Sequence, residues 1–299
     1  SGSLAVIGNA SSEELNSDPK WEIDILPSTL ILADSTWQIS PSHIQIDSTS
    51  YSIENFKISQ DQQFFAIDGK VSSHAEDIIK CQIHDISLNN INTISGNKNL
   101  GIDGNTRGYF QLSDFYGDRL TKADLVLDNL TFNRDTIGDF YLKSDWDKDE
   151  QKLSLESYAI HNNKREINIE GDYFPAADSI NLSLSLDSMR MNVLRPYLEG
   201  NISELDGRIG GFMQVEGSTS LPRFYGKLKF LNTSFKVDEL QTKYTCNDSI
   251  IFTPQEIQFN NLKIYDSENN LAEIYGAITL NNFEKIDLDL ALSTTNFKL

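Results

Sequence analysis

Apolar and polar residues alternate along almost the whole chain from Trp21 onward. The two clearest ladders are Ile180–Leu186 and Ile286–Leu292, in which every second residue is Ile or Leu. A period of two places successive side chains on opposite faces of a strand. Segments rich in Asn, Asp, Ser and Gly, such as DSENN at Asp266–Asn270, separate the ladders and are typical of hairpin turns. The pattern predicts an all-β protein made of antiparallel hairpins with one apolar and one polar face.

One segment, SMRMNVLRPYLEGN at Ser188–Asn201, breaks this alternation. Its apolar residues recur every three to four positions, which is the spacing of a helix. Pro196 keeps such a helix short or kinks it, and Gly200 can end it. We therefore predict one short helix here.

Three glycines, Gly207, Gly210 and Gly211, stand close enough together to suggest a phosphate-binding loop. Such a loop needs a helix after it, because the helix N-terminus supplies N–H groups to the anion. Met213 and Val215 instead alternate with polar residues, as in a strand, and the lysine of a Walker motif is missing. The glycines are therefore predicted to be strand and turn residues.

Two segments repeat one pattern of glycine, aromatic and aliphatic residues. IDGNTRGYFQLSD (Ile102–Asp114) aligns with LDGRIGGFMQVEG (Leu205–Gly217) at an offset of 103 residues, and a looser copy upstream has Gly69 in the glycine position. Repetition at a fixed period indicates tandem units that stack on one another. The prediction is a flexible lead-in at 1–20 with an expression-tag remnant at Ser1–Ser3, then a partial β repeat at 21–83 and β repeats at 84–186 and 187–299, stacked as one elongated domain.

Composition narrows the classes of partner. The formal net charge is −19, and the Lys and Arg residues form no run, which argues against nucleic acid and against docking of the outer surface on anionic lipid. The two cysteines, Cys81 and Cys246, exclude a disulfide scaffold and are expected to be buried thiols, with one long-range bridge between them in an oxidising compartment as the alternative. No stretch reaches the ~18 apolar residues of a membrane-spanning helix, and the first ten residues lack the features of a signal peptide.

No motif for catalysis or metal binding stands out. Cys81 and His84 have a C-x-x-H spacing, but a strand places them on opposite faces and two ligands do not complete a zinc site. The segment DWDKDEQKLSLE starts like a calcium loop at Asp145, yet Glu150 occupies the place of the required glycine. We therefore predict an acidic hairpin turn, with adventitious calcium binding as the minor alternative. No cofactor, metal or catalytic residue is expected, and an enzyme ranks below the two binding functions considered next.

The apolar face of a one-sided sheet must be covered by a second sheet, by closure of the sheet on itself, or by an apolar ligand. A trough lined by Leu, Ile and Phe suits acyl chains. The alternative is an extracellular β-sandwich for adhesion or carbohydrate binding, with Trp37 and Trp146 as contributors to an exposed binding surface.

The segment Met191–Phe230 resembles the AsmA-like/TamB family. Its helix-like MNVLRPYLEGN is followed by ISELDGRIGGFMQVEGSTSLPRFYGKLKF, which is similar to the family's helix, glycine, aliphatic strand, glycine and proline pattern. Asp266 and Gly276 continue the likeness, and Ile86–Phe174 matches more loosely because it lacks an equivalent of Pro222. The resemblance covers most of the chain after Trp21, and the composition, rich in Asn, Ile, Lys and Asp, suits a Bacteroidetes member.

The resemblance implies a folded-over antiparallel sheet, a β-taco, with a continuous hydrophobic groove. Family members are periplasmic, anchored at the inner membrane, and implicated in moving phospholipid to the outer membrane and in outer-membrane protein assembly with a barrel partner. The expected partners are therefore phospholipid acyl chains and a barrel protein, with the membrane anchor outside the present segment. The predicted groove residues are Leu182, Leu184, Leu228, Phe230, Ile257, Phe259, Ile278, Leu280, Leu288 and Leu290.

Overall fold

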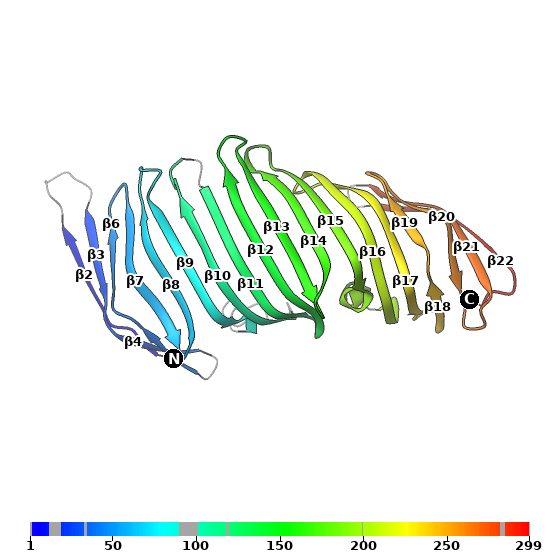
Figure 1. The fold of residues 1–299 in the computed structure, drawn as a ribbon, viewed down its shortest axis with the longest axis horizontal. Coiled ribbons are helices and arrows are strands. Elements are labelled where there is room, and N and C mark those ends of the chain that lie inside the picture. The colour runs from blue at the N-terminus through cyan, green and yellow to red at the C-terminus, as the bar shows by residue number, and fades with distance from the viewer. Residues whose placement is uncertain are drawn as a thin grey trace. The chain divides into compact units, whose positions relative to one another are not determined.

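The computed structural model describes residues 2–11, 19–32, 35–89, 101–117, 120–198, 200–281 and 285–298. Its strands belong to one large antiparallel sheet of 22 strands (Figure 1). The all-β class and the antiparallel arrangement predicted from the alternation are therefore confirmed. Within the described residues, no helix has the length and hydropathy needed to cross a lipid bilayer.

The chain divides into two compact units, residues 1–134 with 138–154 and residues 135–137 with 155–299. The strands β12 (Asp135–Asp147) and β13 (Lys152–His161) contribute residues to both. The first unit contains β1 (Gly2–Ser3), β2 (Val6–Ser11), β3 (Lys20–Ile25), β4 (Ser28–Leu32), β5 (Ser35–Ile39), β6 (Ser42–Ile46), β7 (Tyr51–Gln60), β8 (Gln63–Val71), β9 (Ile78–Ser87), β10 (Ile102–Ser113) and β11 (Leu120–Phe132). The second contains β14 (Lys164–Phe174), β15 (Ser179–Arg190), β16 (Ile202–Ser218), β17 (Pro222–Val237), β18 (Thr242–Cys246), β19 (Ser249–Phe252), β20 (Glu256–Tyr265), β21 (Leu271–Asn281) and β22 (Lys285–Thr294).

In three runs of the chain, strands that follow one another pair with one another, whereas nearer the N-terminus β1 pairs with β4, β3 with β6 and β5 with β7. In the first unit β7 pairs with β8, β8 with β9, β9 with β10, and β10 with β11. In the second unit the same succession runs from β14 to β17 and from β20 to β22. Between these two runs, β18 and β19 pair with different parts of β17, so that one strand position is filled by two short strands. The meander follows from the short polar turns between the ladders.

The first residues differ from the sequence prediction. Residues 1–20 showed no apolar ladder and were predicted to be a flexible lead-in, yet β1 pairs with β4 and β2 pairs with β3. Every residue of β2 is exposed. The pairing of β2 therefore rests on backbone hydrogen bonds to β3 and not on a buried face, and alternation of apolar residues cannot reveal such a strand.

In several strands, a residue with left-handed backbone conformation changes the face on which the following side chains lie. Ser188 in β15, Asn232 in β17 and Asn261 in β20 have φ of 65°, 48° and 63°, and the pairing register shifts beside each of them. One extra residue at such a bulge turns the following side chains to the opposite parity. In β20, Ile257 and Phe259 before the bulge thus share a face with Leu262 and Ile264 after it.

The predicted short helix is present. A 3₁₀ turn, η2 (Met191–Leu194), leads into the helix α2 (Arg195–Leu198), whereas Met189 still belongs to β15. A further 3₁₀ turn, η1, covers Pro175–Ala177. The Arg195 side chain donates from Nε and Nη2 to the carbonyl oxygen of Leu205 in β16, at 3.2 and 3.1 Å. This contact fixes the helical segment over the apolar face of the second unit, where the core consists of Leu186, Met191, Leu205, Ile209, Met213 and Leu228.

Candidate apolar binding site

An apolar pocket of about 660 Å³ lies in the second unit. Its wall is built from β16 to β22 together with the helical segment that follows β15. Met191, Leu194 and Leu198 enter it from the helical segment, because their spacing of three to four residues places them on one side of that segment. The volume falls within the ~300–1,000 Å³ range typical of sites for small molecules.

The few polar groups in the pocket wall are already satisfied inside the protein. Thr233 Oγ1 donates to the carbonyl oxygen of Arg208 at 3.2 Å, and the Tyr244 hydroxyl donates to that of Lys298 at 2.9 Å. Burial raises the pKa of the Cys246 thiol to about 11, so the thiol is neutral at physiological pH. The pocket wall thus offers apolar surface and no charge, which suits a ligand held by burial of hydrocarbon.

The last described residues form one side of the pocket. The Phe297 ring stacks on Tyr244 with centroids 5.3 Å apart and an interplanar angle of 13°. The Lys298 N–H donates to Oδ2 of the buried Asp266 at 2.9 Å. Burial alone raises the pKa of Asp266, but hydrogen bonds from Asn270, Lys298 and Glu268 outweigh it and lower the pKa to about 2. An ionised carboxylate therefore holds Phe297 against the pocket over the whole physiological pH range.

The ten residues predicted for the groove lie at three kinds of place. Leu228, Phe230, Ile257 and Phe259 line the pocket. Leu184 packs against the core cluster beside it, and Leu182 shares the face of Leu184 on β15. Ile278 lies in β21 opposite Leu288 of β22. Leu288 and Leu290 lie on the same face of β22 as Leu292, which lines the pocket. Leu280 is also in β21, but its side chain lies outside the described residues.

Several pocket residues were not predicted from the sequence. The helical segment contributes Met191 and Leu194, and Leu262 and Ile264 reach the pocket because of the bulge at Asn261. Asn261 was the one sign of this bulge in the sequence. Asn tolerates the left-handed conformation better than most residues, and Asn261 stands at the point where the apolar residues change from odd to even positions.

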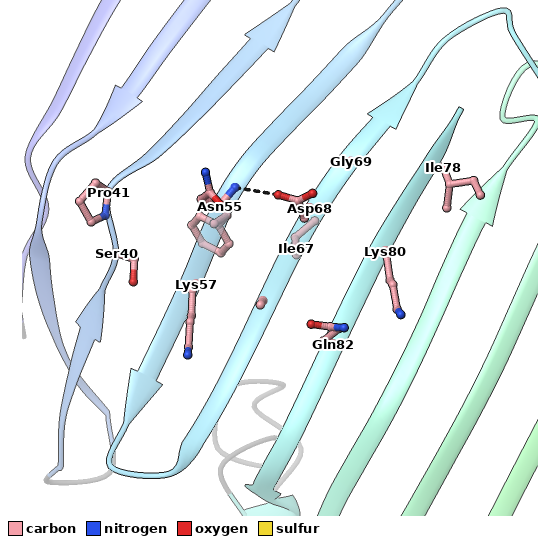
Figure 2. A pocket seen from close by; sticks show the side chains of 12 residues that line it. Ser40, Pro41, Asn55, Lys57, Ile67, Asp68, Gly69, Ile78, Lys80 and Gln82 are labelled. Carbon is pink, nitrogen blue, oxygen red and sulfur yellow. Dashed lines mark hydrogen bonds between the residues drawn. The ribbon is translucent and has the colours of Figure 1, made fainter. Parts of the chain in front are cut away.

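A second hollow, of about 720 Å³, lies in the first unit (Figure 2). Lys57, Lys80 and Gln82 line it together with Asp68, whose Oδ2 accepts the Asn55 N–H at 2.9 Å. The two ammonium groups are already placed over aromatic rings, Lys57 over Phe64 at 4.3 Å and Lys80 over Tyr109 at 4.5 Å. The lining of the hollow is mixed, because apolar residues such as Phe56, Ile67 and Ile78 stand beside the polar ones.

The remaining sequence motifs have structural explanations. Gly207, Gly210 and Gly211 all lie inside β16 and no helix follows them, as predicted. Cys81 and His84 pair with Ile67 and Phe64, which lie on opposite faces of β8. Both cysteines are free and buried. Among the described residues, no group of three or more His, Cys, Asp or Glu side chains could hold a metal ion.

The segment that begins at Asp145 forms the turn between β12 and β13. Asp147 Oδ1 accepts the backbone N–H groups of Asp149 and Glu150, at 2.9 and 3.1 Å. This is the acidic hairpin turn that the sequence predicted. Trp37, a predicted contributor to a carbohydrate-binding surface, is only 3% exposed, and the Trp146 Nε1 is buried. The Trp37 indole therefore cannot serve as an open stacking platform for a sugar, whereas Trp146 as a whole is partly exposed.

We expect Cys81 and Cys246 to react with iodoacetamide much more slowly in the folded than in the denatured protein. Burial raises the pKa of both thiols from 9.0 to about 11. A rise of this size lowers the thiolate fraction at pH 8 about 100-fold, and steric exclusion slows the reaction further. Mass spectrometry of the two alkylated peptides against time measures both rates. Rapid labelling of Cys246 in folded protein would contradict a dry pocket wall.

No family model, curated protein or solved structure matches the chain.

Proposed function

We propose that the apolar face of the second unit binds phospholipid acyl chains, and that the chain is a segment of a lipid-conducting β-groove protein of the AsmA-like/TamB type. The observation that carries this proposal is the uncharged pocket of about 660 Å³, whose polar wall groups are bonded within the protein. Each methylene buried there contributes about 0.8 kcal/mol. Ten methylenes contribute about 8 kcal/mol before the cost of ordering the chain is subtracted.

Recurrence of backbone conformation supports the tandem repeats that belong to this proposal. Residues with positive φ recur 103 positions apart, and they hold corresponding places at bulges and glycine positions of successive strands. A chance alignment of alternating sequences does not explain a shared left-handed conformation, because most residues avoid it. The pairs are Asp85 with Ser188, Gly104 with Gly207, Gly108 with Gly211, and Asn129 with Asn232.

In this role the protein acts in the periplasm, where it passes phospholipid between the inner and outer membranes and supports outer-membrane protein assembly. The surface charge suits such a carrier. A formal charge of −19 keeps the outer surface away from anionic headgroups, so that contact with lipid is confined to the apolar face.

The test is the amount of phospholipid that co-purifies with protein made in bacteria, measured by native mass spectrometry and lipid extraction. Phe259→Asp places a carboxylate in the pocket wall, and we expect it to lower bound phospholipid at least about tenfold, since burying an unpaired charge is costly. The matched control is Asn260→Asp, which adds the same group to the exposed side of the same strand and should leave bound lipid unchanged.

A second variant separates loss of lipid from loss of fold. Ile257→Trp keeps the pocket apolar but narrows it, so bound phospholipid should fall while the circular dichroism spectrum stays that of wild type. A wild-type protein that carries no lipid, and takes none up from vesicles of phosphatidylethanolamine and phosphatidylglycerol, would refute the proposal. The carbohydrate-binding alternative would then be tested next.

A further inference from the structure

The two ends of the apolar pocket in the second unit are built from different elements. At one end, which we call the strand end, the lining residues Phe252 and Ile257 lie in β19 and β20. At the other, which we call the capped end, two segments outside the strands also line the pocket. They contribute Leu198, from α2, and Phe297, which follows β22. An elongated ligand therefore meets different surroundings at its two ends.

The pairing of β17 with its neighbours places both ends along one strand. Phe252 lies opposite Gly226, near the start of β17. Val237, the last residue of β17, lies opposite Ile202 at the start of β16, and both residues line the pocket. The pocket thus runs along β17 from the strand end to the capped end.

Three aromatic rings lie together at the capped end. Phe235 of β17 lies opposite Tyr244 of β18, and their ring centroids are 5.9 Å apart. The Phe297 ring stacks on Tyr244 at 5.3 Å, and Tyr244 is only 3% exposed. All three side chains line the pocket, and we call them the aromatic wall. The one hydroxyl group of this wall already donates to a backbone carbonyl, so a ligand that reaches the capped end meets an apolar surface.

Backbone contacts hold Phe297 at the aromatic wall independently of its side chain. Asn296 has φ of 60° and lies in a bend that follows β22. Lys298 donates its N–H to Oδ2 of Asp266, and its carbonyl oxygen accepts the Tyr244 hydroxyl, both at 2.9 Å. A substitution at Phe297 therefore removes the ring and leaves these hydrogen bonds in place.

We propose that an acyl chain lies in the pocket with its methyl end against the aromatic wall, and that the Phe297 ring limits the length of chain that the pocket accepts. A methyl group suits the capped end, since a carboxylate or phosphate would be buried there without a partner, which is costly. The polar head then lies at the strand end. The inference rests on the proposed function, because it concerns which acyl chains the same pocket accepts.

The test measures how tightly the full chain binds unbranched saturated fatty acids of ten to twenty carbons. Displacement of cis-parinaric acid reports binding, with each acid kept below the concentration at which it forms micelles. Each methylene that enters the pocket should raise the affinity about fourfold. Once the methyl end reaches the aromatic wall, further methylenes remain outside, and each should change the affinity by less than about twofold. Wild type should therefore show a break at one chain length.

Two substitutions of Phe297 should move this break. Phe297→Ala vacates the space of the ring, so the break should move to acids at least two carbons longer, and the affinity for the longest acids should rise about tenfold. Phe297→Leu keeps part of the side chain and should move the break in the same direction by a smaller step. Phe297 does not belong to the core cluster, so both variants should keep the circular dichroism spectrum of wild type.

Phe252→Ala is the matched control. It removes the same ring from the strand end, and should lower the affinity for all the acids by a similar factor while the break stays at the wild-type length.

Three results would overturn the inference and leave the proposed function standing. They are a break that Phe297→Ala does not move, an equal movement of the break by Phe252→Ala, and a wild-type affinity that rises without a break to twenty carbons. If no fatty acid displaces the probe from wild type, the proposed function itself fails.

Discussion

Gly226→Ala should destabilise the second unit by about 2–6 kcal/mol, the sum of about 1–3 kcal/mol of backbone strain and about 1–3 kcal/mol for the steric clash. Gly226 lies in β17 opposite Met213 of β16, with φ of 150°. A Cβ atom there would lie 2.2 Å from the backbone carbonyl oxygen of Phe212. Because that oxygen belongs to the neighbouring strand and not to a movable side chain, the two strands must separate to accommodate it.

Hydrogen exchange followed by mass spectrometry is the suitable measurement, since all three tryptophans lie in the first unit and do not report on the second. Peptides from β16 and β17 should exchange faster in the variant, while those from β7 to β9 stay as in wild type. Gly8→Ala is the matched control, because Gly8 has nothing within 4 Å of a Cβ and an ordinary φ. If Gly226→Ala left hydrogen exchange in β16 and β17 unchanged, this result would contradict the close approach of these two strands.

The regular alternation of apolar residues was enough to predict the fold class and many strands. β15 illustrates why. Leu182, Leu184 and Leu186 keep one parity up to Ser188, and all three lie on the face that bears the core. Over such a stretch the pleat of the strand alone decides which side chains are buried.

The alternation could not predict where strands change phase. In β20, Ile257 and Phe259 have odd numbers and were assigned to the groove, whereas Leu262 and Ile264 have even numbers and were overlooked. The left-handed residue Asn261 between them moves both pairs to one face. A bulge depends on how two strands pair, so one strand's pattern indicates it only through a residue type that tolerates positive φ.

The local pattern also could not predict which elements would pack against one another in the folded chain. The spacing of apolar residues predicted the helical segment after β15, but not that Met191 and Leu194 would close one side of a pocket. Leu288 and Leu290 show the converse case. Their alternation is as regular as that of β15, yet Leu288 is 67% and Leu290 44% exposed. Burial of such a ladder depends on what packs across it, which the ladder itself does not specify.

Leu205→Ala should destabilise the second unit by about 2–5 kcal/mol and, at the same time, enlarge the site for an apolar ligand. Leu205 is only 2% exposed, belongs to the core cluster and lines the pocket. Its carbonyl oxygen also accepts the two Arg195 hydrogen bonds, which the substitution leaves in place. The loss therefore arises from the missing side chain and not from release of the helical segment. Leu221→Ala, at a position 48% exposed, should change stability by less than about 0.5 kcal/mol.

The variant also connects the core to the proposed function. A ligand that binds only the folded state stabilises it by an amount that grows with the ratio of its concentration to Kd. Lauric acid, whose chain can occupy the space that Leu205 vacates, should therefore raise the urea midpoint of the variant more than that of wild type. Equal shifts would mean that the vacated space is not continuous with the pocket. A loss of stability below about 1 kcal/mol would mean that this wall is not part of the core.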